Sequence, residues 1–334
     1  MGLILGIEST AHTFSFGAVS SDGVSVLPSH SSLYRPEEGG IHPREAADHH
    51  VNSSRTLLEK AMDDWGISGG EIDAVAFSQG PGLGPCLRVG GSVARSMSIA
   101  LDVPLIGVNH CVAHIEIGRR MTGCSDPVLL YVSGGNTQVI ARASGRYRVL
   151  GETLDIGIGN MLDKFGRAIG IPFPGGPIIE KKATEYIKEN GPDRILDLPY
   201  AVHGTDMAFS GILGAAISHA NRGEDHGLVC HSLQEVSFAS CVEVGERAMA
   251  LTGKSEILLG GGVACNRRIR EMTQTMASER GGSAHWPDWR LCIDNGTMIA
   301  ELGRRMLDSG EATKLENSAI DPSLRTDMTP ISWS

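Results

Sequence analysis

The first half of the chain alternates short apolar runs with polar turns, a pattern typical of strands joined by tight loops. Asp22-Gly23 separates two of these runs and is a common hairpin turn. A helical spacing of apolar residues follows, and a glycine-rich turn that begins at Gly80 opens a second helix. The pattern predicts strands over 3–8, 14–20, 24–27, 74–78 and 104–109, and a helix over 44–65.

The second half repeats this plan at an offset of about 125 residues. Three strand-like runs again come first, and helices then alternate with strands. A less regular insertion is expected over 191–221. The predicted strands are 128–132, 137–142, 147–151 and 257–259, and the predicted helices are 160–169, 177–189, 234–251 and 296–307.

The repetition predicts an internally duplicated α/β protein whose two domains face each other across a cleft. We expect an N-terminal domain over 1–125, a C-terminal domain over 126–314, and a polar tail or linker over 315–334. The hairpin turns carry serine, glycine and asparagine, which are suited to holding phosphate groups. Ordinary turns remain the alternative interpretation.

Composition narrows the class of protein. Apolar residues make up 41% of the chain and charged residues 20%, as in soluble globular proteins. The net charge of −10 argues against a protein that grips nucleic acid alone, although basic partners could present an RNA to it. The local basic clusters are expected to be solvated helix faces. Seven cysteines without CxxC spacing, no leader and no long apolar run predict a cytoplasmic protein that is neither secreted nor membrane-spanning.

The segment VNHCVAHIEIGRR (108–120) carries the most specific chemistry. His110 and His114 lie four residues apart at the start of a predicted helix, so both imidazoles share one helix face and could bind one metal ion. Two ordinary buried histidines are the alternative. Cys111 stands where a zinc protease would carry its glutamate base, which disfavours a protease.

Two glycine-rich segments resemble nucleotide-binding motifs without matching them. Residues 80–84 have GxGxG spacing instead of GxGxxG, and no acidic residue follows at the expected distance. Gly253-Lys254-Ser255 looks like the end of a P-loop, but Ala248 stands at the position of its first glycine. Neither a dinucleotide-binding domain nor a Walker site is predicted.

Motifs along nearly the whole chain, from Leu3 to about Thr326, resemble the TsaD/Kae/Qri family, in its archaeal and eukaryotic cytosolic branch. His231 departs from the family pattern, where an aromatic residue is expected. The segments that carry the resemblance are IHPREAADHH (41–50), PGLGPCLRVG (81–90), GVNHCVAHIEIGR (107–119), YVSGGNTQV (131–139), ETLDIGIGNMLDKFGR (152–167), GGPIIE (175–180), SLQEVSFA (232–239), GGGVACN (260–266) and DNGTMIA (294–300).

This resemblance implies the ASKHA fold, shared by actin-like ATPases, sugar kinases and heat-shock ATPases, which agrees with the duplication. It implies a metal site of His110, His114, Tyr131 and Asp294, a set that suits one iron ion per subunit, with zinc as the alternative. Gly176 would let backbone close on a nucleoside, and Asp163 and Glu180 would suit ribose hydroxyls. The implied substrate or nucleotide positions are Tyr131, Val132, Ser133, Gly134, Gly135, Asp163, Gly176, Glu180 and Asn266.

The implied activity is tRNA N6-adenosine threonylcarbamoyl transfer. The group would pass from threonylcarbamoyl-AMP to N6 of the adenosine 3′ to the anticodon, in tRNAs that read codons beginning with A. Glu8 is a candidate for proton handling. ATP is the other implied nucleotide ligand, with Mg²⁺ as a further cofactor.

The implied partners are tRNA and the KEOPS subunits: a Bud-type protein kinase, a Cgi-type subunit and a Pcc-type subunit. The tail after Leu315 could lead to a fused kinase domain. The alternative function is a small-molecule kinase or ATPase on the same fold, which would use Mg²⁺ held by carboxylates; the paired histidines argue against it. An architectural subunit that binds ATP is a third interpretation.

Overall fold

A computed structural model describes residues 2–36 and 40–333. The chain divides into two compact units. The first contains Met1–Arg120, Ala143–Tyr147 and Ile293–Ser334, and the second contains Met121–Arg142 and Arg148–Cys292. Gly39, in the segment before the first predicted helix, and Ser334, in the expected tail, lie outside the described residues.

The first unit is built on a five-stranded sheet in the order β3-β2-β1-β4-β5. β1 pairs antiparallel with β2 and parallel with β4, which is parallel to β5. The carboxyl ends of β1, β4 and β5 therefore meet at one edge, where ligands commonly bind in α/β sheets. The strands are β1 (Leu3–Glu8), β2 (Thr13–Ser20), β3 (Val26–Leu33), β4 (Ile72–Gly80) and β5 (Leu105–Asn109).

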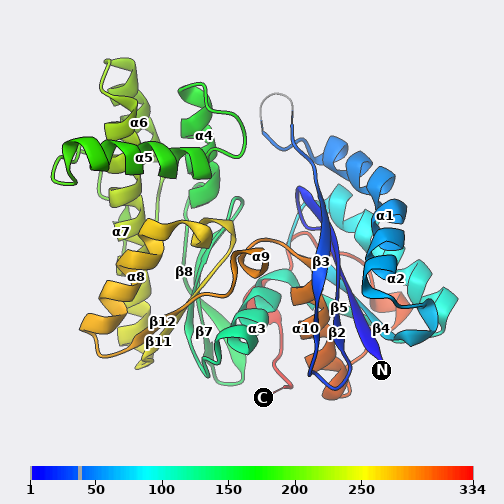
Figure 1. Cartoon of the computed structure of the whole chain (residues 1–334). Coiled ribbons are helices and arrows are strands. Elements are labelled where there is room, and N and C mark those ends of the chain that lie inside the picture. Colours follow the sequence, from blue (N-terminus) through cyan, green and yellow to red (C-terminus); the bar gives the residue numbers. More distant parts are fainter. Residues whose placement is uncertain (1, 37–39, 334) are drawn as a thin grey trace. The chain divides into compact units, whose positions relative to one another are not determined.

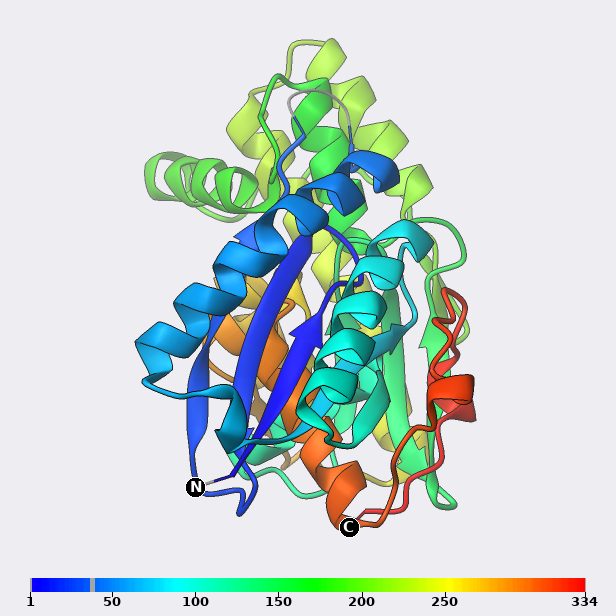
Figure 2. The ribbon, with the colours of Figure 1, turned by 90° about the vertical axis from the view of Figure 1, so that its right-hand side faces the viewer.

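Helices cover both faces of this sheet. α1 (Pro43–Trp65) and α2 (Gly84–Leu101) pack their apolar side chains onto one face, and Figure 2 shows them in front of the strands with α10 (Gly296–Asp308) behind. α10 approaches the opposite face so closely that a Cβ on Gly6 would lie 2.3 Å from the backbone nitrogen of Ala300. Glycine is required there because a larger residue would push the helix away from the sheet. The fourth helix of this unit is α3 (His110–Thr122).

The second unit repeats the strand plan in the order β12-β11-β6-β7-β8. β6 pairs antiparallel with β7 and parallel with β11, just as β1 pairs with β2 and β4. This matching order confirms the predicted duplication. The strands are β6 (Val128–Val132), β7 (Thr137–Ala143), β8 (Arg146–Glu152), β11 (Glu256–Gly260) and β12 (Ser283–His285), and all but β6 are labelled in Figure 1.

The core of the second unit lies between its sheet and its helices. Leu130, Val139 and Leu259 from the strands join Phe165, Phe209 and Phe238 from helical segments in one buried cluster. A two-stranded ribbon, β9 (Val202–His203) with β10 (Asp206–Met207), lies outside the main sheet. The helices are α4 (Ile158–Ala168), α5 (Gly176–Asn190), α6 (Ser210–Asn221), α7 (His226–Thr252), α8 (Arg267–Glu279) and α9 (Trp289–Cys292).

Several local predictions were wrong. The expected irregular insertion over 191–221 ends in a regular helix, α6, whose Ile212 and Ala216 are buried. β12 was not predicted, because its three residues carry no apolar run. β3 begins at Val26 and extends to Leu33 instead of ending at residue 27.

The domain boundaries also differ from the expected division. α10 was assigned to the C-terminal domain, but it packs on the first sheet and belongs to the first unit. The segment after Leu315 is not a loose tail. Arg95 donates to the carbonyl of Ser318 at 2.6 Å, Gln79 donates to the carbonyl of Ala319 at 2.8 Å, and the Trp333 side chain is buried.

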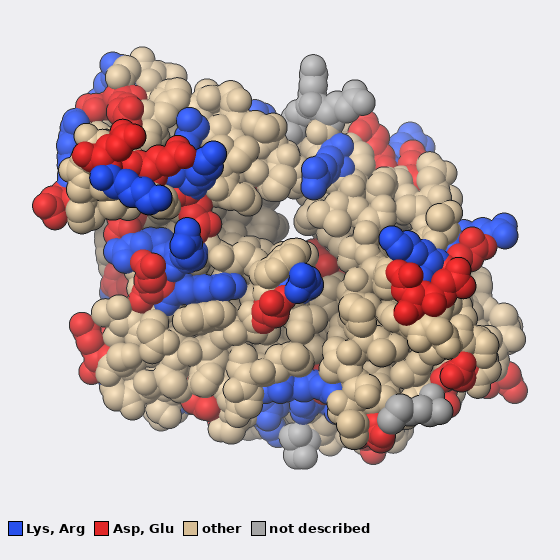
Figure 3. Space-filling model, viewed as in Figure 1, with Lys and Arg blue, Asp and Glu red and all other residues tan. Residues whose placement is uncertain are grey.

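Charged side chains are largely intermixed on the face shown in Figure 3. Lys181 pairs with Glu185, and Arg268 pairs with Glu235 at 2.6 Å, as expected for solvated helix faces. Arg119 and Arg120 differ, because their partners are fully buried glutamates. Among the described residues, no helix combines the length and apolar character needed to cross a bilayer.

Candidate metal centre

The two histidines enter the site through the junction of β5 and α3. The side chain of Asn109 accepts hydrogen bonds from the backbone N–H groups of Cys111 and Val112 at 3.0 and 3.2 Å, which starts the helix directly after the strand. His110 and His114 then lie on one face of the first helical turn, and both are buried. Their imidazole rings are 4.8 Å apart, edge to face.

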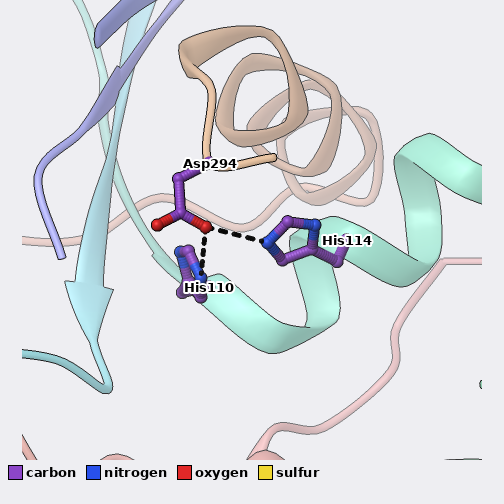
Figure 4. Close-up of side chains that lie close together, drawn as sticks. All are labelled: His110, His114 and Asp294. Atoms are coloured by element: carbon purple, nitrogen blue, oxygen red, sulfur yellow. Dashed lines mark hydrogen bonds and ion pairs between the residues drawn. The ribbon is translucent and has the colours of Figure 1, made fainter. Parts of the chain in front are cut away.

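Asp294 reaches the same point from the segment before α10. Its Oδ1 lies 3.4 Å from Nε2 of His110 and 3.4 Å from Nε2 of His114 (Figure 4). Asn295, and not Asp294, caps α10 by accepting from the N–H of Met298 at 2.9 Å. The Asp294 carboxylate therefore points to the histidines instead of serving the helix end. One ligand atom from each of the three residues falls within 4.8 Å of the others, as in a metal site.

The local electrostatics keep His114 and Asp294 in the forms that bind metals. Burial lowers the pKa of His114, so its imidazole stays neutral at neutral pH. Burial alone would raise the pKa of Asp294, but the adjacent imidazoles of His110 and His114 hold it well below its usual value. Neutral imidazoles and an ionised carboxylate are the protonation states required of ligands.

Glu8 lies behind His110 at the carboxyl end of β1. Its Oε2 is 3.0 Å from Nδ1 of His110, while its Oε1 accepts from the N–H and the hydroxyl of Thr10 at 2.6 and 2.5 Å. The Glu8 side chain is fully buried. A carboxylate on Nδ1 of a histidine fixes the ring and leaves Nε2 to face a metal. The geometry therefore gives Glu8 an orienting contact with a candidate ligand.

The donor set fits a transition metal better than magnesium. Two imidazole nitrogens and one carboxylate oxygen suit iron or zinc, whereas Mg²⁺ prefers oxygen ligands in an octahedral shell. Tyr131, the fourth ligand implied by resemblance, ends up in β6 of the second unit, where it is buried. Its part in the metal set remains a prediction.

The turn after β6 brings four of the predicted nucleotide positions together. The carbonyl oxygens of Ser133 and Gly134 accept from the N–H groups of Gly159 and Asn160 at 3.0 and 3.1 Å, which seats the turn on the start of α4. A Cβ on Gly261 would lie 2.4 Å from the carbonyl oxygen of Val132. Gly134 and Gly135 have open space where a Cβ would stand. The turn therefore has a backbone surface free of side chains, as a phosphate cradle requires.

The remaining nucleotide candidates form two hydrogen-bonded groups. Oδ1 of Asp163 accepts from the N–H of Gly175 at 2.7 Å, which joins α4 to the start of α5. Oε1 of Glu180 accepts from the N–H of Arg267 at 2.9 Å. Asn266 caps α8 through the N–H of Arg268 and donates to Gln234 at 2.6 Å. Glu180 and Asn266 thus lie at the same end of α8.

Gly176 and its neighbour Gly175 differ in the space that a side chain would find, and the predicted nucleoside contact of Gly176 stays a prediction. A Cβ on Gly176 would meet only a side-chain atom of Leu162, at 3.9 Å. A Cβ on Gly175 would lie 3.3 Å from the Leu162 carbonyl oxygen and 3.4 Å from Asp163. Thr10, Gly175 and the orienting contact of Glu8 were missed, because each depends on contacts between elements. In the sequence, only the position of Glu8 at the end of an apolar strand indicated that its carboxylate could lie in a site.

Two solved structures share the fold of this chain. The chain matches HypF from Thermococcus kodakarensis with a TM-score of 0.61, 14% identity, and coverage of 92% of this chain and 48% of that one. It matches component A of (R)-2-hydroxyglutaryl-CoA dehydratase from Acidaminococcus fermentans with a TM-score of 0.59, 10% identity, and coverage of 92% and 100%. The fold is the ASKHA fold of actin-like proteins.

The sequence comparisons identify the family. The family model described as TsaD, tRNA N6-adenosine threonylcarbamoyltransferase, matches residues 26–301. The chain therefore belongs to the TsaD family.

Curated relatives come in two lengths. The chain is 50% identical to the "Probable bifunctional tRNA threonylcarbamoyladenosine biosynthesis protein" of Thermoplasma volcanium over 99% of this chain and 61% of that protein. It is 49% identical to the "tRNA N6-adenosine threonylcarbamoyltransferase" of Methanococcoides burtonii over 100% of this chain and 98% of that protein. The chain thus spans about three fifths of the bifunctional relatives and nearly all of the single-function one.

Proposed function

We propose that this chain is the catalytic subunit of a tRNA N6-adenosine threonylcarbamoyltransferase. The observation that carries the proposal is the convergence of His110, His114 and Asp294 in a protein of the TsaD family. The acyl donor is threonylcarbamoyl-AMP, and the acceptor is N6 of the adenosine 3′ to the anticodon in tRNAs that read codons beginning with A. That adenosine lies in a single-stranded loop and can enter a protein site without opening a duplex.

His110, His114 and Asp294 would hold the metal, with Tyr131 as the fourth ligand, and iron is the metal we propose. A metal ion bound there acts as a Lewis acid or template for the carbamoyl carbonyl group. Glu8 and Thr10 keep the His110 ring in the orientation that presents Nε2 to the site. Glu8 is therefore proposed as a positioning residue, and proton transfer by Glu8 remains a competing prediction.

The nucleotide part of the donor would lie in the second unit. The backbone of Ser133, Gly134 and Gly135 offers N–H groups to a phosphate, with Val132 leading into the turn. Asp163 and Glu180 are the candidates for ribose hydroxyls, near Gly176 and Asn266. ATP could use the same positions, and Mg²⁺ could accompany its phosphates.

The proposed partners follow from the family and from the names of relatives. They are tRNA, a Bud-type kinase, and Cgi-type and Pcc-type subunits, assembled as KEOPS in the cytoplasm. The relative from Thermoplasma volcanium is named as bifunctional and is longer than the 61% of it that this chain covers, which is compatible with the proposed kinase partner. Basic partners would also compensate for the net charge of −10 during RNA binding.

The central test measures threonylcarbamoyl transfer to unmodified tRNA with threonylcarbamoyl-AMP and the partner subunits. His110→Ala should lower the rate by at least about 100-fold, because it removes a direct ligand. His203→Ala, at an exposed position of β9, is the matched control and should retain the rate of the unmodified protein. Undiminished transfer by His110→Ala would overturn the role assigned to the metal.

Metal analysis separates this proposal from the alternative. Anaerobic purification should yield about one tightly bound iron per chain, and His114→Ala should lose it. A small-molecule kinase or ATPase would instead require Mg²⁺ alone and would act without iron. An architectural role would be supported if nucleotide binding persisted while no substitution at these residues changed tRNA modification.

A further inference from the structure

The cysteines of this chain occupy very different environments. All seven are free, and six of them are buried; Cys265 alone is partly exposed. Cys265 ends the 3-10 helix η2 (Gly262–Cys265), and Cys292 ends α9. Both belong to the second unit. An accessible thiol close to a second thiol is the arrangement on which oxidation can act.

The two thiols share one small region of the structure. Sγ of Cys265 lies 3.8 Å from the carbonyl oxygen of Trp289, and Sγ of Cys292 lies 3.4 Å from that of Pro287. Arg270 lies next to both cysteines. Its Nη2 is 3.9 Å from Sγ of Cys292, and its Nε donates to the carbonyl of Ala264, the residue before Cys265, at 2.6 Å. A guanidinium in this position stabilises a thiolate.

The thiols also interact with each other. A hydrogen bond from Cys292, together with the charge of Arg270, lowers the pKa of the Cys265 thiol below its usual value of 9.0. Burial has the opposite effect on other cysteines and raises the pKa of Cys86 to about 11 and that of Cys230 to about 12. At any pH below 9, Cys265 therefore carries a larger thiolate fraction than Cys86 or Cys230.

We propose that Cys265 and Cys292 form a reversible dithiol–disulfide pair and are the site at which peroxides or low-molecular-weight disulfides oxidise this protein. With a peroxide, the Cys265 thiolate attacks the O–O bond and becomes a sulfenic acid, while the leaving hydroxide takes up a proton. The sulfur of Cys292 then attacks the sulfenic sulfur, and water leaves with the Cys292 proton. Two thiols lose two electrons and two protons, and one peroxide becomes two waters.

The position of the pair gives oxidation a local consequence. Cys265 directly precedes Asn266, the cap of α8, and Cys292 lies two residues before Asp294. A disulfide would link η2 to α9 covalently and restrict both segments. The proposal stands on the second unit alone and does not depend on the transferase activity.

The first test uses the unmodified full chain and brief alkylation with iodoacetamide at pH 8, followed by peptide mapping. Cys265 should react first, faster than Cys86, because its thiol has the lower pKa and is partly exposed. Cys292→Ala should slow alkylation of Cys265, because it removes the hydrogen bond that lowers the pKa of the Cys265 thiol. Equal rates for Cys265 and the buried cysteines would overturn the proposal, and this measurement needs no variant to fold.

The second test oxidises the chain with a small excess of hydrogen peroxide or oxidised glutathione. Free thiols should fall from seven to five, with the loss of two hydrogen atoms and a cross-linked peptide that contains Cys265 and Cys292; dithiothreitol should reverse both. Cys86→Ser should still lose two thiols, whereas Cys265→Ser should lose none. Retention of all thiols, or a different pair in the cross-linked peptide, would contradict the proposal.

Discussion

Two buried polar clusters join α3 to the segment of α10, and they contain different chemistry. At the start of α3, His110 and His114 meet Asp294 through atoms that all carry lone pairs. At the end of α3, Glu116 and Glu301 are surrounded by arginine side chains. Both clusters lie in the first unit, within the same pair of helical segments.

Glu116 is held by hydrogen bonds and ion pairs from four different parts of the first unit. Tyr147 donates to its Oε1 at 2.5 Å, and the indole N–H of Trp333 donates to the same oxygen at 2.9 Å. Arg119 and Arg305 pair with its Oε2 at 3.1 and 3.2 Å. The carboxylate is fully buried, and both of its oxygens are satisfied.

Glu301, on α10, is arranged in the same way. Arg304 and Arg305 pair with its Oε1 at 3.1 and 2.7 Å, and Arg120 pairs with its Oε2. Burial alone would raise its pKa, but Arg304 and Arg305 lower it below the usual value. Four arginines surround the two glutamates, so both carboxylates are fully paired and neither is left to bind a cation.

The difference shows how one pair of segments supports both stability and binding. Arginine side chains pair with carboxylates across the two helices in the arginine–glutamate cluster, which fixes the end of α3 against α10. In the histidine–aspartate cluster, by contrast, two imidazole nitrogens and a carboxylate oxygen lie close together, as the ligand atoms of a bound cation do. We therefore expect substitutions in the first kind of cluster to change the free energy of unfolding, and substitutions in the second to change metal affinity.

The largest expected effect is on folding. Glu301→Gln leaves Arg120, Arg304 and Arg305 close together without their buried counter-charge, so the free energy of unfolding should fall by about 3–5 kcal/mol. Denaturant titration measures this loss. Glu59→Gln, in an exposed pair with Arg55, is the control and should cost about 0.5 kcal/mol or less. A loss below about 1 kcal/mol for Glu301→Gln would remove the distinction between the clusters.

The second effect is on metal binding. Asp294→Asn should weaken iron or zinc binding by more than about 100-fold, because a direct ligand loses its charge. Its free energy of unfolding without metal should fall by less than that of Glu301→Gln, because Asp294 faces two imidazoles instead of three arginines. Calorimetric titration with metal measures the first quantity, and Asp63→Asn, at an exposed position of α1, is the control. Unchanged affinity would exclude Asp294 as a ligand.

The third prediction separates an orienting Glu8 from a proton-transferring one. Glu8→Gln should weaken metal binding by about 10–100-fold, since Nδ1 of His110 loses its carboxylate partner. Metal titration measures the effect, and Glu45→Gln, exposed on α1, should leave affinity unchanged. Loss of transfer activity with full metal affinity would instead support a proton-transfer role.

The fourth prediction concerns the chain segment that closes the arginine–glutamate cluster. Trp333→Phe removes the N–H that donates to Glu116, so the free energy of unfolding should fall by about 1–3 kcal/mol. Thermal or denaturant unfolding measures it. Trp289→Phe, at an exposed ring, should have little effect. Equal effects from the two substitutions would show that the buried hydrogen bond contributes nothing.

The smallest expected effect is on acid sensitivity. Because the pKa of Glu301 is lower in the folded chain than its usual 4.5, its ionisation stabilises the fold above pH 4.5, and this contribution disappears as pH falls through the folded pKa. Glu301→Gln should therefore lose less stability than the unmodified chain on acidification below pH 4.5. Parallel acid-unfolding curves for the two proteins would contradict this assignment.

Much of the fold could be predicted from local sequence patterns. Apolar runs and the Asp22-Gly23 turn located the strands of both sheets, except for β12. Their repetition predicted the duplication that the strand orders confirm. β12 and α6 were missed because their residues carry weak local signals and are specified by packing against neighbouring elements.

The candidate site was predicted less completely. The four-residue spacing of His110 and His114 predicted a shared helix face, but Asp294 came only from family resemblance. The contact between Glu8 and His110 spans 102 positions, and the link from Trp333 to Glu116 spans 217. Such partners leave no periodic pattern in the chain.

The sequence by itself determined the strands, most helices, the duplication and the paired histidines, because these depend on residue spacing within one element. Tertiary structure alone decided that α10 joins the first sheet, that Asn295 caps it, and that Asp294 is thereby directed to His110 and His114. Tertiary structure also decided that the buried glutamates pair with arginines, whereas Asp294 faces two histidines in a candidate cation site. Those outcomes depend on distances between segments far apart in the chain, which only packing of the whole unit sets.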